Sequence, residues 1–292
     1  MSAIRVELGT RSYSILVRPG LLDEAAAHIS KMLSPSSALL LTHPRLAELY
    51  AAPIISGFEN AGIRATVMTL PAGERFKTLN TVSRIYRALL DHRADRSSVL
   101  VVLGGGLLGD VGGFAAATYL RGIPFVQIPT TLLAQVDASV GGKTGVDLPQ
   151  GKNLVGAFHQ PRAVLIDTDT LRSLPARELR SGLAEVIKYG IICDKGLFDR
   201  LGKEMPRLLR RDSPALASVI VRSCEIKADV VSKDEFERGA RAILNFGHTV
   251  GHALESLTVY RQFKHGEAIS IGMVSAAHVR SEERRVGKEC RL

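Results

Sequence analysis

Two histidines and one glutamate could bind a metal ion, and each lies in a short motif rich in glycine or polar residues. The three motifs are Ala184-Glu-Val-Ile-Lys188 around Glu185, Asn245-Phe-Gly-His-Thr-Val-Gly-His252 around His248, and His265-Gly-Glu267 at His265. Two imidazoles and a carboxylate are a common ligand set for a catalytic Zn²⁺ ion that keeps one coordination position open. Their spacing matches no short metal-binding motif, so the residues indicate a metal site without fixing it.

Further polar residues continue the pattern around His248. The residues, at spacings of 4, 4, 3 and 4, are Glu237, Arg241, Asn245, His248 and His252. On one continuous helix, which we expect here, they would form a single polar stripe that mixes both charge signs and lines a site. Gly247 and Gly251 each cost about 1 kcal/mol inside a helix, which indicates close approach of another element. Glu185 and Lys188 also share a helix face.

A glycine turn follows an apolar strand pattern in the first half. Gly104-Gly-Gly106 comes directly after 98–103, and a helix is expected from about Leu107. Glycine permits positive φ and close backbone approach, and a helix N-terminus at this point favours a bound anion. A plain tight strand–helix turn remains the alternative. Taken alone, the run Ala72-Gly-Glu-Arg-Phe-Lys77 reads as the capped start of a helix.

Two lysines stand next to glycines within ten residues, in Gly141-Gly-Lys143 and Gly151-Lys152. A cation beside flexible, exposed backbone suits a phosphate or a carboxylate. Two solvated lysines in surface loops are the alternative. Because two such sites lie so close together, we favour an anion site.

The composition is that of a soluble globular protein. The chain has 292 residues, 46% hydrophobic and 23% charged, which is enough for one large domain or two ordinary ones. Cys193, Cys224 and Cys290 are far apart, which argues against a disulfide framework or a cysteine zinc site and favours the cytoplasm. Neither a signal peptide nor a membrane-spanning stretch is recognisable. The net charge of +9 comes from scattered lysines and arginines, which suits an anionic small substrate better than nucleic acid.

Strand and helix patterns alternate up to about residue 175. Strands are expected near 4–8, 13–17, 38–42, 64–70, 98–103, 124–128 and 163–166, with helices near 21–32, 45–61 and 77–92. This order predicts a Rossmann-like α/β domain over 1–175, with a mainly parallel sheet and helices on both faces. From 176 to 280 the apolar residues follow helical spacing, which predicts an all-helical second domain.

Together the motifs resemble the 3-dehydroquinate synthase family, and they run collinearly from about residue 4 to 280. The matching runs are Gly104-Gly-Gly…Asp110…Gly113-Phe114, Arg121-Gly122, Pro129-Thr-Thr-Leu132, Val136-Asp-Ala-Ser-Val-Gly-Gly-Lys-Thr144, Gly151-Lys-Asn153, Ala184-Glu-Val-Ile-Lys188, Leu244-Asn-Phe-Gly-His-Thr-Val-Gly-His-Ala253 and His265-Gly-Glu267. The resemblance implies an NAD-dependent, Zn²⁺- or Co²⁺-dependent lyase of the shikimate pathway, usually a homodimer. Its implied reaction converts 3-deoxy-D-arabino-heptulosonate 7-phosphate to 3-dehydroquinate and phosphate through transient oxidation by NAD, phosphate elimination, reduction and aldol cyclisation.

The resemblance also implies residue roles. The metal ligands are Glu185, His248 and His265. The NAD contacts are Gly73, Glu74, Lys77, Gly105, Gly106, Asp110, Thr130 and Thr131, together with Lys143, Lys152 and, in the segment from Thr170 to Ser173, Thr170 and Ser173. The substrate-binding and catalytic residues are Asp137, Lys143, Lys152, Asn153, Lys188, Lys227, Arg241, Asn245 and His252, with His252 moving a proton during ring opening. Arg121 reaches the substrate phosphate of the neighbouring subunit.

The sequence departs from the family after Arg280. The segment 281–292 has seven charged residues in twelve, and relatives continue with further helices and another active-site lysine. We expect an unpacked tail, apolar faces at 214–230 and 266–279 without partner helices, and a fragment that is poorly soluble or inactive. A sister sugar-phosphate cyclase acting on another heptulose or hexose phosphate, and a non-catalytic NAD- and metal-binding fragment, remain alternatives. Asp110 and the run 136–144 favour the dehydroquinate synthase over a sister cyclase.

Overall fold

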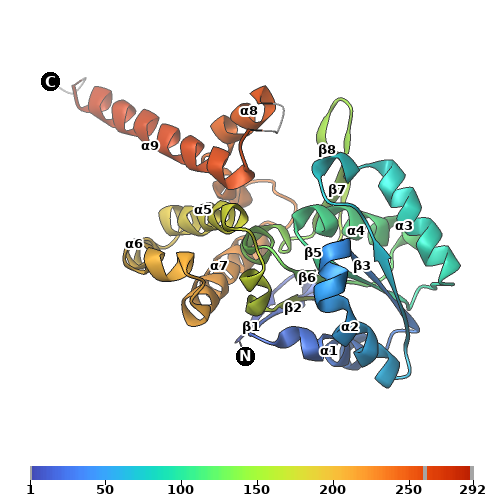
Figure 1. Cartoon of the computed structure of the whole chain (residues 1–292). Helices are drawn as coiled ribbons and strands as arrows, with labels where there is room; N and C mark the ends of the chain where they lie inside the picture. The colour runs from blue at the N-terminus through green and yellow to red at the C-terminus, as the bar shows by residue number, and fades with distance from the viewer. Residues whose placement is uncertain (1, 259–261, 290–292) are drawn as a thin grey trace.

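The first half of the chain forms a seven-stranded sheet. The structure, a computed structural model, describes residues 2–258 and 262–289 (Figure 1). The strands are β1 (Ser2–Val6), β2 (Tyr13–Val17), β3 (Ser37–Thr42), β4 (Arg64–Thr69), β5 (Val99–Gly104), β6 (Phe125–Pro129) and β9 (Ala163–Ile166), in the order β1-β2-β9-β6-β5-β3-β4. Strand β1 pairs antiparallel with β2, and the other pairs of this sheet are parallel. The predicted, mainly parallel sheet is therefore confirmed.

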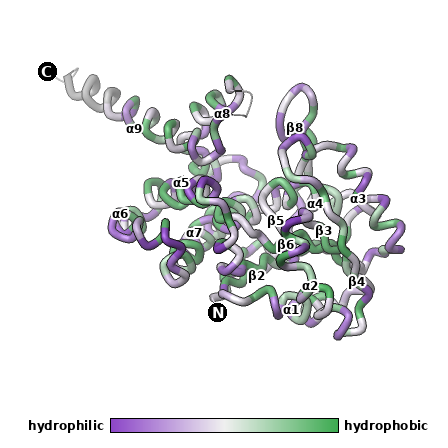
Figure 2. Tube along the Cα trace, in the orientation of Figure 1, coloured by the Kyte–Doolittle hydropathy of each residue, from purple (hydrophilic) through white to green (hydrophobic). Residues whose placement is uncertain are grey.

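Helices cover both faces of this sheet, because its central strands are apolar on both sides (Figure 2). Leu39 and Leu41 of β3 pack with α3 (Leu79–Asp91) and α4 (Gly106–Thr118), whereas Ala38 and Leu40 pack with α1 (Ala25–Leu33) and α2 (Pro44–Asn60). The carboxyl ends of the parallel strands and the N-terminus of α4 lie at one edge of the sheet, and the candidate site lies at this edge.

A β-hairpin contains the two glycine–lysine runs. Strands β7 (Lys143–Leu148) and β8 (Gly151–Phe158) pair antiparallel, so Lys143 and Lys152 lie on strands and the alternative of two lysines in surface loops is wrong. Gly145 and Gly156 face each other, and a Cβ on either would meet backbone atoms of the opposite strand at 2.2–2.7 Å. Glycine is rare in strands, so the packing that requires it here also hides the strands from sequence patterns.

Helices make up the second half, and no strand follows β9 among the described residues. They are α5 (Ala176–Ile192), α6 (Lys195–Leu209), α7 (Ser213–Lys233), the short 3₁₀ helix η7 (Ala240–Asn245), α8 (His248–Leu257) and α9 (His265–Glu289). The expectation that 214–230 lacks partners is wrong, because Leu216, Val219 and Ile220 are buried in one cluster with Val6 and Ile15 of the sheet. This helical domain thus packs directly on the α/β domain (Figure 1).

The polar stripe does not lie on one continuous helix. Helix η7 ends at Asn245, Gly247 adopts a left-handed φ of 80°, and α8 begins at His248. The predicted close approach at both glycines is confirmed: a Cβ on Gly247 would lie 2.7 Å from the backbone nitrogen of Met273, and one on Gly251 would lie 2.6 Å from Ile269. The left-handed φ and the lack of room for a side chain beside α9 both require glycine at position 247.

Helix α9 runs from His265 to Glu289 and extends away from the body (Figure 1). Its inner face buries Ala268, Ile269 and Met273, whereas Val274 is 59% exposed. The expectation of an uncovered apolar surface at 266–279 therefore holds for the outer face only. Among the described residues, no helix combines the length and apolarity needed to cross a membrane.

Candidate metal and substrate site

Glu185, His248 and His265 come together, although they lie on three different helices. Glu185 lies in α5, whereas His248 and His265 are the first residues of α8 and α9. Oε1 of Glu185 is 3.7 Å from Nε2 of His248 and 3.5 Å from Nε2 of His265, and the three donor atoms lie within 4.8 Å of one another. One ion could therefore contact all three side chains after small rotations.

The carboxylate of Glu185 fits a cation site. Glu185 is completely buried, and neither of its oxygens has a hydrogen-bond partner among the described residues, although the ammonium of Lys188 forms an ion pair with Oε2. A buried charge is costly unless it is paired or coordinates a metal. Burial would raise the pKa of Glu185, but His265 and Lys188 hold it below its ordinary value. Glu185 is therefore held as a carboxylate, which is the form that can bind a metal cation.

The motif His265-Gly266-Glu267 fastens α9 to α5. The backbone N–H of Gly266 donates to Oγ of Ser181 at 3.0 Å, and a Cβ on Gly266 would lie 2.0 Å from the carbonyl oxygen of Ser181. Both carboxylate oxygens of Glu267 accept from Arg177 at 2.7 Å. These contacts place His265 beside Glu185, so all three residues of the motif contribute to the position of His265 relative to α5.

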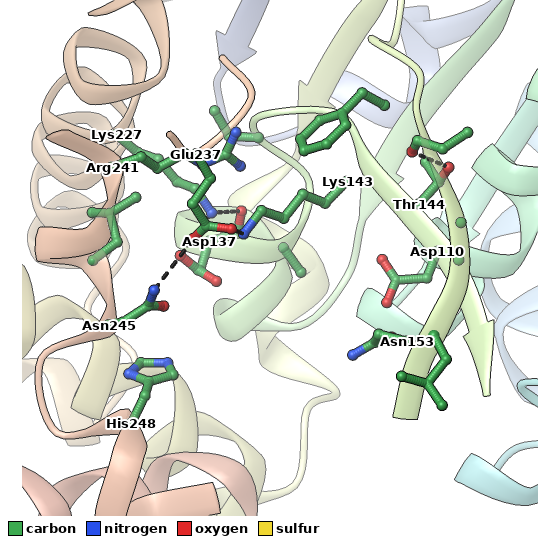
Figure 3. Close-up of a pocket in the computed structure, with 18 of the residues that line it drawn as sticks. Asp110, Asp137, Lys143, Thr144, Asn153, Lys227, Glu237, Arg241, Asn245 and His248 are labelled. Carbon is green, nitrogen blue, oxygen red and sulfur yellow. Dashed lines mark hydrogen bonds and ion pairs between the residues drawn. The ribbon is translucent and has the colours of Figure 1, made fainter. Parts of the chain in front are cut away.

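A cavity of about 600 Å³ lies next to the metal group, between the β7–β8 hairpin and the helical domain (Figure 3). This volume suits a small organic ligand. Most of the predicted substrate residues line it: Asp137, Lys143, Asn153, Lys188, Lys227, Arg241, Asn245 and the metal-group residue His248, together with Asp110 from the predicted NAD set. The lining contains four cations, Lys143, Lys188, Lys227 and Arg241, and three carboxylates, Asp110, Asp137 and Glu237, so the cavity is chemically suited to a polar, charged ligand.

Ion pairs organise the cationic wall of the cavity. Nζ of Lys227 donates to Asp137 Oδ1 at 2.7 Å, and the hydroxyl of Tyr189 donates to the same oxygen at 2.9 Å. Burial would raise the pKa of Asp137, but the ammonium groups of Lys227 and Lys188 hold it well below its ordinary value. Asp137 is therefore a fixed carboxylate that orders the lysines around it.

Lys143 and Arg241 bridge the two domains. Lys143 forms an ion pair with Glu237, which also accepts from Nδ2 of Asn245 at 3.3 Å (Figure 3). Nη1 of Arg241 donates to the carbonyl oxygens of Gly141 at 3.2 Å and Glu235 at 2.7 Å. The wall of the cavity is thus shared by both domains.

The predicted NAD and substrate sets meet at Asp110. Nζ of Lys77 donates to Asp110 at 2.6 Å and to Oδ1 of Asn153. Burial raises the pKa of Asp110 to about 6 despite the neighbouring Lys77. Lys152 pairs with Glu74 at 2.7 Å. This pair joins the hairpin to the 3₁₀ helix η3 (Glu74–Phe76), which directly follows Gly73.

The glycine turn after β5 leads into α4, as expected, but the reason for the glycines differs from the predicted one. None of Gly104, Gly105 and Gly106 has a positive φ, so that part of the prediction is wrong. A Cβ on Gly105 would lie 3.2 Å from Thr131, and one on Gly106 would lie 3.0 Å from Ala138, so the glycines serve close packing. No side chain caps the N-terminus of α4, which leaves backbone N–H groups for an anion.

The remaining predicted NAD residues lie at the same sheet edge. The N–H of Thr130 donates to the carbonyl oxygen of Gly104 at 2.9 Å, and Oγ1 of Thr131 accepts from Ala134 at 3.1 Å. The buried hydroxyl of Thr170 accepts from Gln135 at 3.1 Å. Ser173 pairs with the Tyr50 hydroxyl at 2.8 Å. The side-chain oxygens of Thr131, Thr170 and Ser173 thus have partners within the chain.

Arg121 and His252 lie outside the lining of the cavity. Arg121 lies between α4 and β6 in a turn where Leu120, Arg121 and Gly122 all have positive φ. The ring of His252 lies 5.2 Å from that of His248 and 6.0 Å from that of His265, measured between centroids. Glu237 was predicted only as part of the polar stripe and does line the cavity, whereas Glu255, which lies beside His265, was not predicted. Their spacing from Arg241 and His248, 4 and 7 positions, was the available signal.

Two solved structures share this architecture. The crystal structure of 2-deoxy-scyllo-inosose synthase complexed with carbaglucose-6-phosphate, NAD⁺ and Co²⁺ has a TM-score of 0.86 at 28% identity over 94% of this chain and 74% of that one. 2-Epi-5-epi-valiolone synthase from Streptomyces hygroscopicus subsp. jinggangensis 5008, with NAD⁺ and Zn²⁺ bound, has a TM-score of 0.82 at 31% identity and the same coverage. The fold and site thus define a synthase-type enzyme built from a parallel-sheet domain and a helical domain.

The family models divide the chain into two matched parts. The 3-dehydroquinate synthase N-terminal model matches residues 67–181, and the C-terminal model matches 182–290, which includes most of the segment set apart as a tail. A 3-dehydroquinate synthase from Desulforamulus reducens is 52% identical over 97% of this chain and 79% of its own length. The chain belongs to the 3-dehydroquinate synthase family.

Proposed function

We propose that the chain converts 3-deoxy-D-arabino-heptulosonate 7-phosphate to 3-dehydroquinate and phosphate, using NAD and one divalent metal ion. One observation carries the proposal: a cavity lined by four cations and three carboxylates adjoins the group formed by Glu185, His248 and His265. A substrate that bears a carboxylate, a phosphate and several hydroxyls matches this combination of charges. The sequence identity to 3-dehydroquinate synthases supports the choice over a sister cyclase.

Glu185, His248 and His265 would hold the metal ion. Two imidazole nitrogens and one buried carboxylate suit Zn²⁺ or Co²⁺ and leave a coordination position for substrate oxygens. Bound there, the ion would supply Lewis acidity to vicinal hydroxyls of the substrate. The two solved synthases are complexes with Co²⁺ and Zn²⁺, which supports a divalent ion here.

The carboxyl edge of the parallel sheet would hold NAD, which would supply reversible hydride transfer. The open N-terminus of α4 suits the pyrophosphate, and Gly73, Gly105 and Thr130 lie around the same edge. Asp110 and Lys77 join this edge to Asn153 of the cavity. A cofactor and a substrate bound in these two places would therefore lie side by side.

The lysines and Arg241 would bind and orient the substrate anions. Lys143, Lys152, Asn153 and Asn245 would hold charged and hydroxyl groups, while Asp137 keeps Lys227 and Lys188 in position. Partial desolvation lowers the pKa of His252, which favours the neutral imidazole that can accept a proton during ring opening. Holding one flexible molecule through several steps is chiefly a matter of orientation.

Arg121 would act in a cytoplasmic homodimer, where it would reach the phosphate site of the other subunit. Left-handed backbone at Leu120 and Arg121 is unusual for residues other than glycine, and such strain often marks a functional position. The residue lies outside the cavity lining of its own chain, which is consistent with a role across an interface.

Phosphate release from the heptulosonate phosphate tests the function. Because the metal group and the cavity are both present in this chain, we expect turnover with NAD⁺ and Zn²⁺ or Co²⁺, in place of the inactivity expected from the sequence. We expect no turnover without NAD⁺ or in His248→Ala, whose metal content should fall. Turnover with another heptulose or hexose phosphate alone would identify a sister cyclase. Binding of NAD and metal without turnover of any of these substrates would identify a non-catalytic fragment, and undiminished metal in His248→Ala would overturn the ligand assignment.

A further inference from the structure

The imidazole of His265 lies between two carboxylates. Its Nε2 is 3.5 Å from Oε1 of Glu185, and its Nδ1 is 3.4 Å from Oε1 of Glu255. A neutral imidazole carries its proton on one nitrogen, and the nitrogen that binds a metal must be the other one. In the neutral ring, a carboxylate that accepts the proton of Nδ1 leaves Nε2, on the side of Glu185, unprotonated and able to bind a metal ion.

Glu255 is placed for this task by α8. It follows His248 by seven positions, two turns of the same helix face, and it is only 8% exposed. A buried carboxylate needs a partner, and the contact with His265 provides one. Gly251 lies between these turns and lets α8 approach α9 closely enough for the contact.

The other candidate ligand histidine shows the same arrangement. Nδ1 of His248 lies 3.3 Å from the carbonyl oxygen of Phe246, while its Nε2 lies 3.7 Å from Glu185. Both histidines thus have an acceptor at Nδ1 and turn Nε2 toward one carboxylate oxygen. Such partners fix the tautomer and orientation of metal-binding histidines.

We propose that Glu255 is a positioning residue that holds the Nδ1 proton of His265, so that Nε2 binds the ion. The inference rests on the metal site proposed above. A different arrangement would make Glu255 itself a ligand, because Glu255, His252 and His265 also lie within 4.8 Å of one another. The group with Glu185 is favoured, since Glu185 is buried and its oxygens have no hydrogen-bond partner among the described residues, whereas His252 is exposed.

Metal affinity of variants tests the proposal independently of turnover. Zn²⁺ affinity would be measured by competition with a chromophoric chelator, with the Co²⁺ absorption spectrum and the His265 tautomer by nitrogen NMR as structural readouts. Glu255→Ala should weaken Zn²⁺ binding about 10–100-fold and change the Co²⁺ spectrum, and Glu255→Gln, which keeps an acceptor oxygen, should recover part of the loss. Glu225→Gln, in an exposed ion pair on α7, is the charge-matched control and should bind normally.

The outcomes separate the inference from the metal site on which it rests. If the unaltered protein binds no Zn²⁺, the proposed metal site is wrong. If it binds Zn²⁺ and Glu255→Ala and Glu255→Gln bind as well as Glu225→Gln, only the role of Glu255 is wrong. Equal losses in His252→Ala and Glu255→Ala, with none in His248→Ala, would make Glu255 a ligand and also overturn the proposal. We expect little change of affinity in His252→Ala.

Discussion

At the scale of single residues, Asp137 holds together groups from both domains. It lies in η5 (Ala134–Ala138) after the sheet strand β6 and pairs with Lys227 of α7. Nζ of Lys227 also donates to the carbonyl oxygen of Asp137 at 2.6 Å. Since Lys227 is 5% exposed, its charge depends on this one residue for compensation.

Asp137→Asn should therefore lower the free energy of unfolding by about 3 kcal/mol, because the variant leaves a buried ammonium without its counter-charge. Urea unfolding followed by circular dichroism measures the loss. The double variant Asp137→Asn, Lys227→Met removes both charges and should be more stable than the single one. A loss below about 1 kcal/mol would show that solvent already reaches the pair.

At the scale of elements, the contact between α5 and the start of α9 sets the position of His265. Gly266→Ala should lower the free energy of unfolding by about 1–3 kcal/mol and weaken Zn²⁺ binding, because a Cβ would press on the carbonyl group of Ser181. Gly202→Ala is the matched control, because Gly202 occupies an exposed position of α6 where a Cβ would meet no atom within 4 Å. The higher helix propensity of alanine should raise the free energy of unfolding of this variant by up to about 1 kcal/mol. Equal effects of the two substitutions on stability would contradict this view.

The Arg177–Glu267 pair at the same junction depends on pH. The Arg177 guanidinium lowers the pKa of Glu267 from 4.5 to about 2. A lowered pKa means that the pair stabilises the protein above pH 4.5 and that this contribution is lost as the pH falls toward 2. Because the pair is partly exposed, Glu267→Gln should cost about 1 kcal/mol or less at pH 7.

Urea unfolding at pH 7 and near pH 2.5 measures this dependence. The difference between Glu267→Gln and the unaltered protein should shrink at the lower pH. Asp199→Asn, in the exposed pair with Lys195 on α6, should have little effect at pH 7. A difference that is independent of pH would assign the effect of Glu267 to packing instead of charge.

The elements show why sequence patterns succeed or fail. The strands of the sheet were predictable because apolar runs such as Val99–Gly104 are buried on both faces. The hairpin was not, because Gly145 and Gly156 pack backbone against backbone and leave no apolar alternation. The break at Gly247 was hidden because the polar residues keep helical spacing through it, and the left-handed conformation of Gly247 is visible only in the structure.

The candidate site itself could be predicted only in part. Motifs pointed to Glu185, His248 and His265, whose grouping in space the structure shows. The pairing of Lys143 with Glu237, which comes from opposite sides of the cavity, depends on how the two domains meet. The spacing of residues along the sequence contains no information about such contacts. The ion-pair partners of the lysines could therefore be identified only from the structure.

At the scale of the whole molecule, we expect the α/β domain to bind NAD⁺ in preference to NADP⁺. The glycine turn after β5 contains no basic residue that could pair with an additional phosphate, and Asp110 lies in the first turns of α4. Thermal unfolding with either dinucleotide should show the larger increase in Tm with NAD⁺. Tighter binding of NADP⁺ by calorimetric titration would contradict the expectation.

The helix that carries His248 has almost no core of its own. Of the ten residues from His248 to Leu257, all within the described part of the chain, only Gly251 and Glu255 are buried. Such a segment has a low free energy of local opening, so its amide hydrogens should exchange with solvent well before those of β5. An ion held by His248 together with Glu185 and His265 would slow that exchange. The ion would thereby stabilise α8 against local opening, as buried leucines stabilise the other helices.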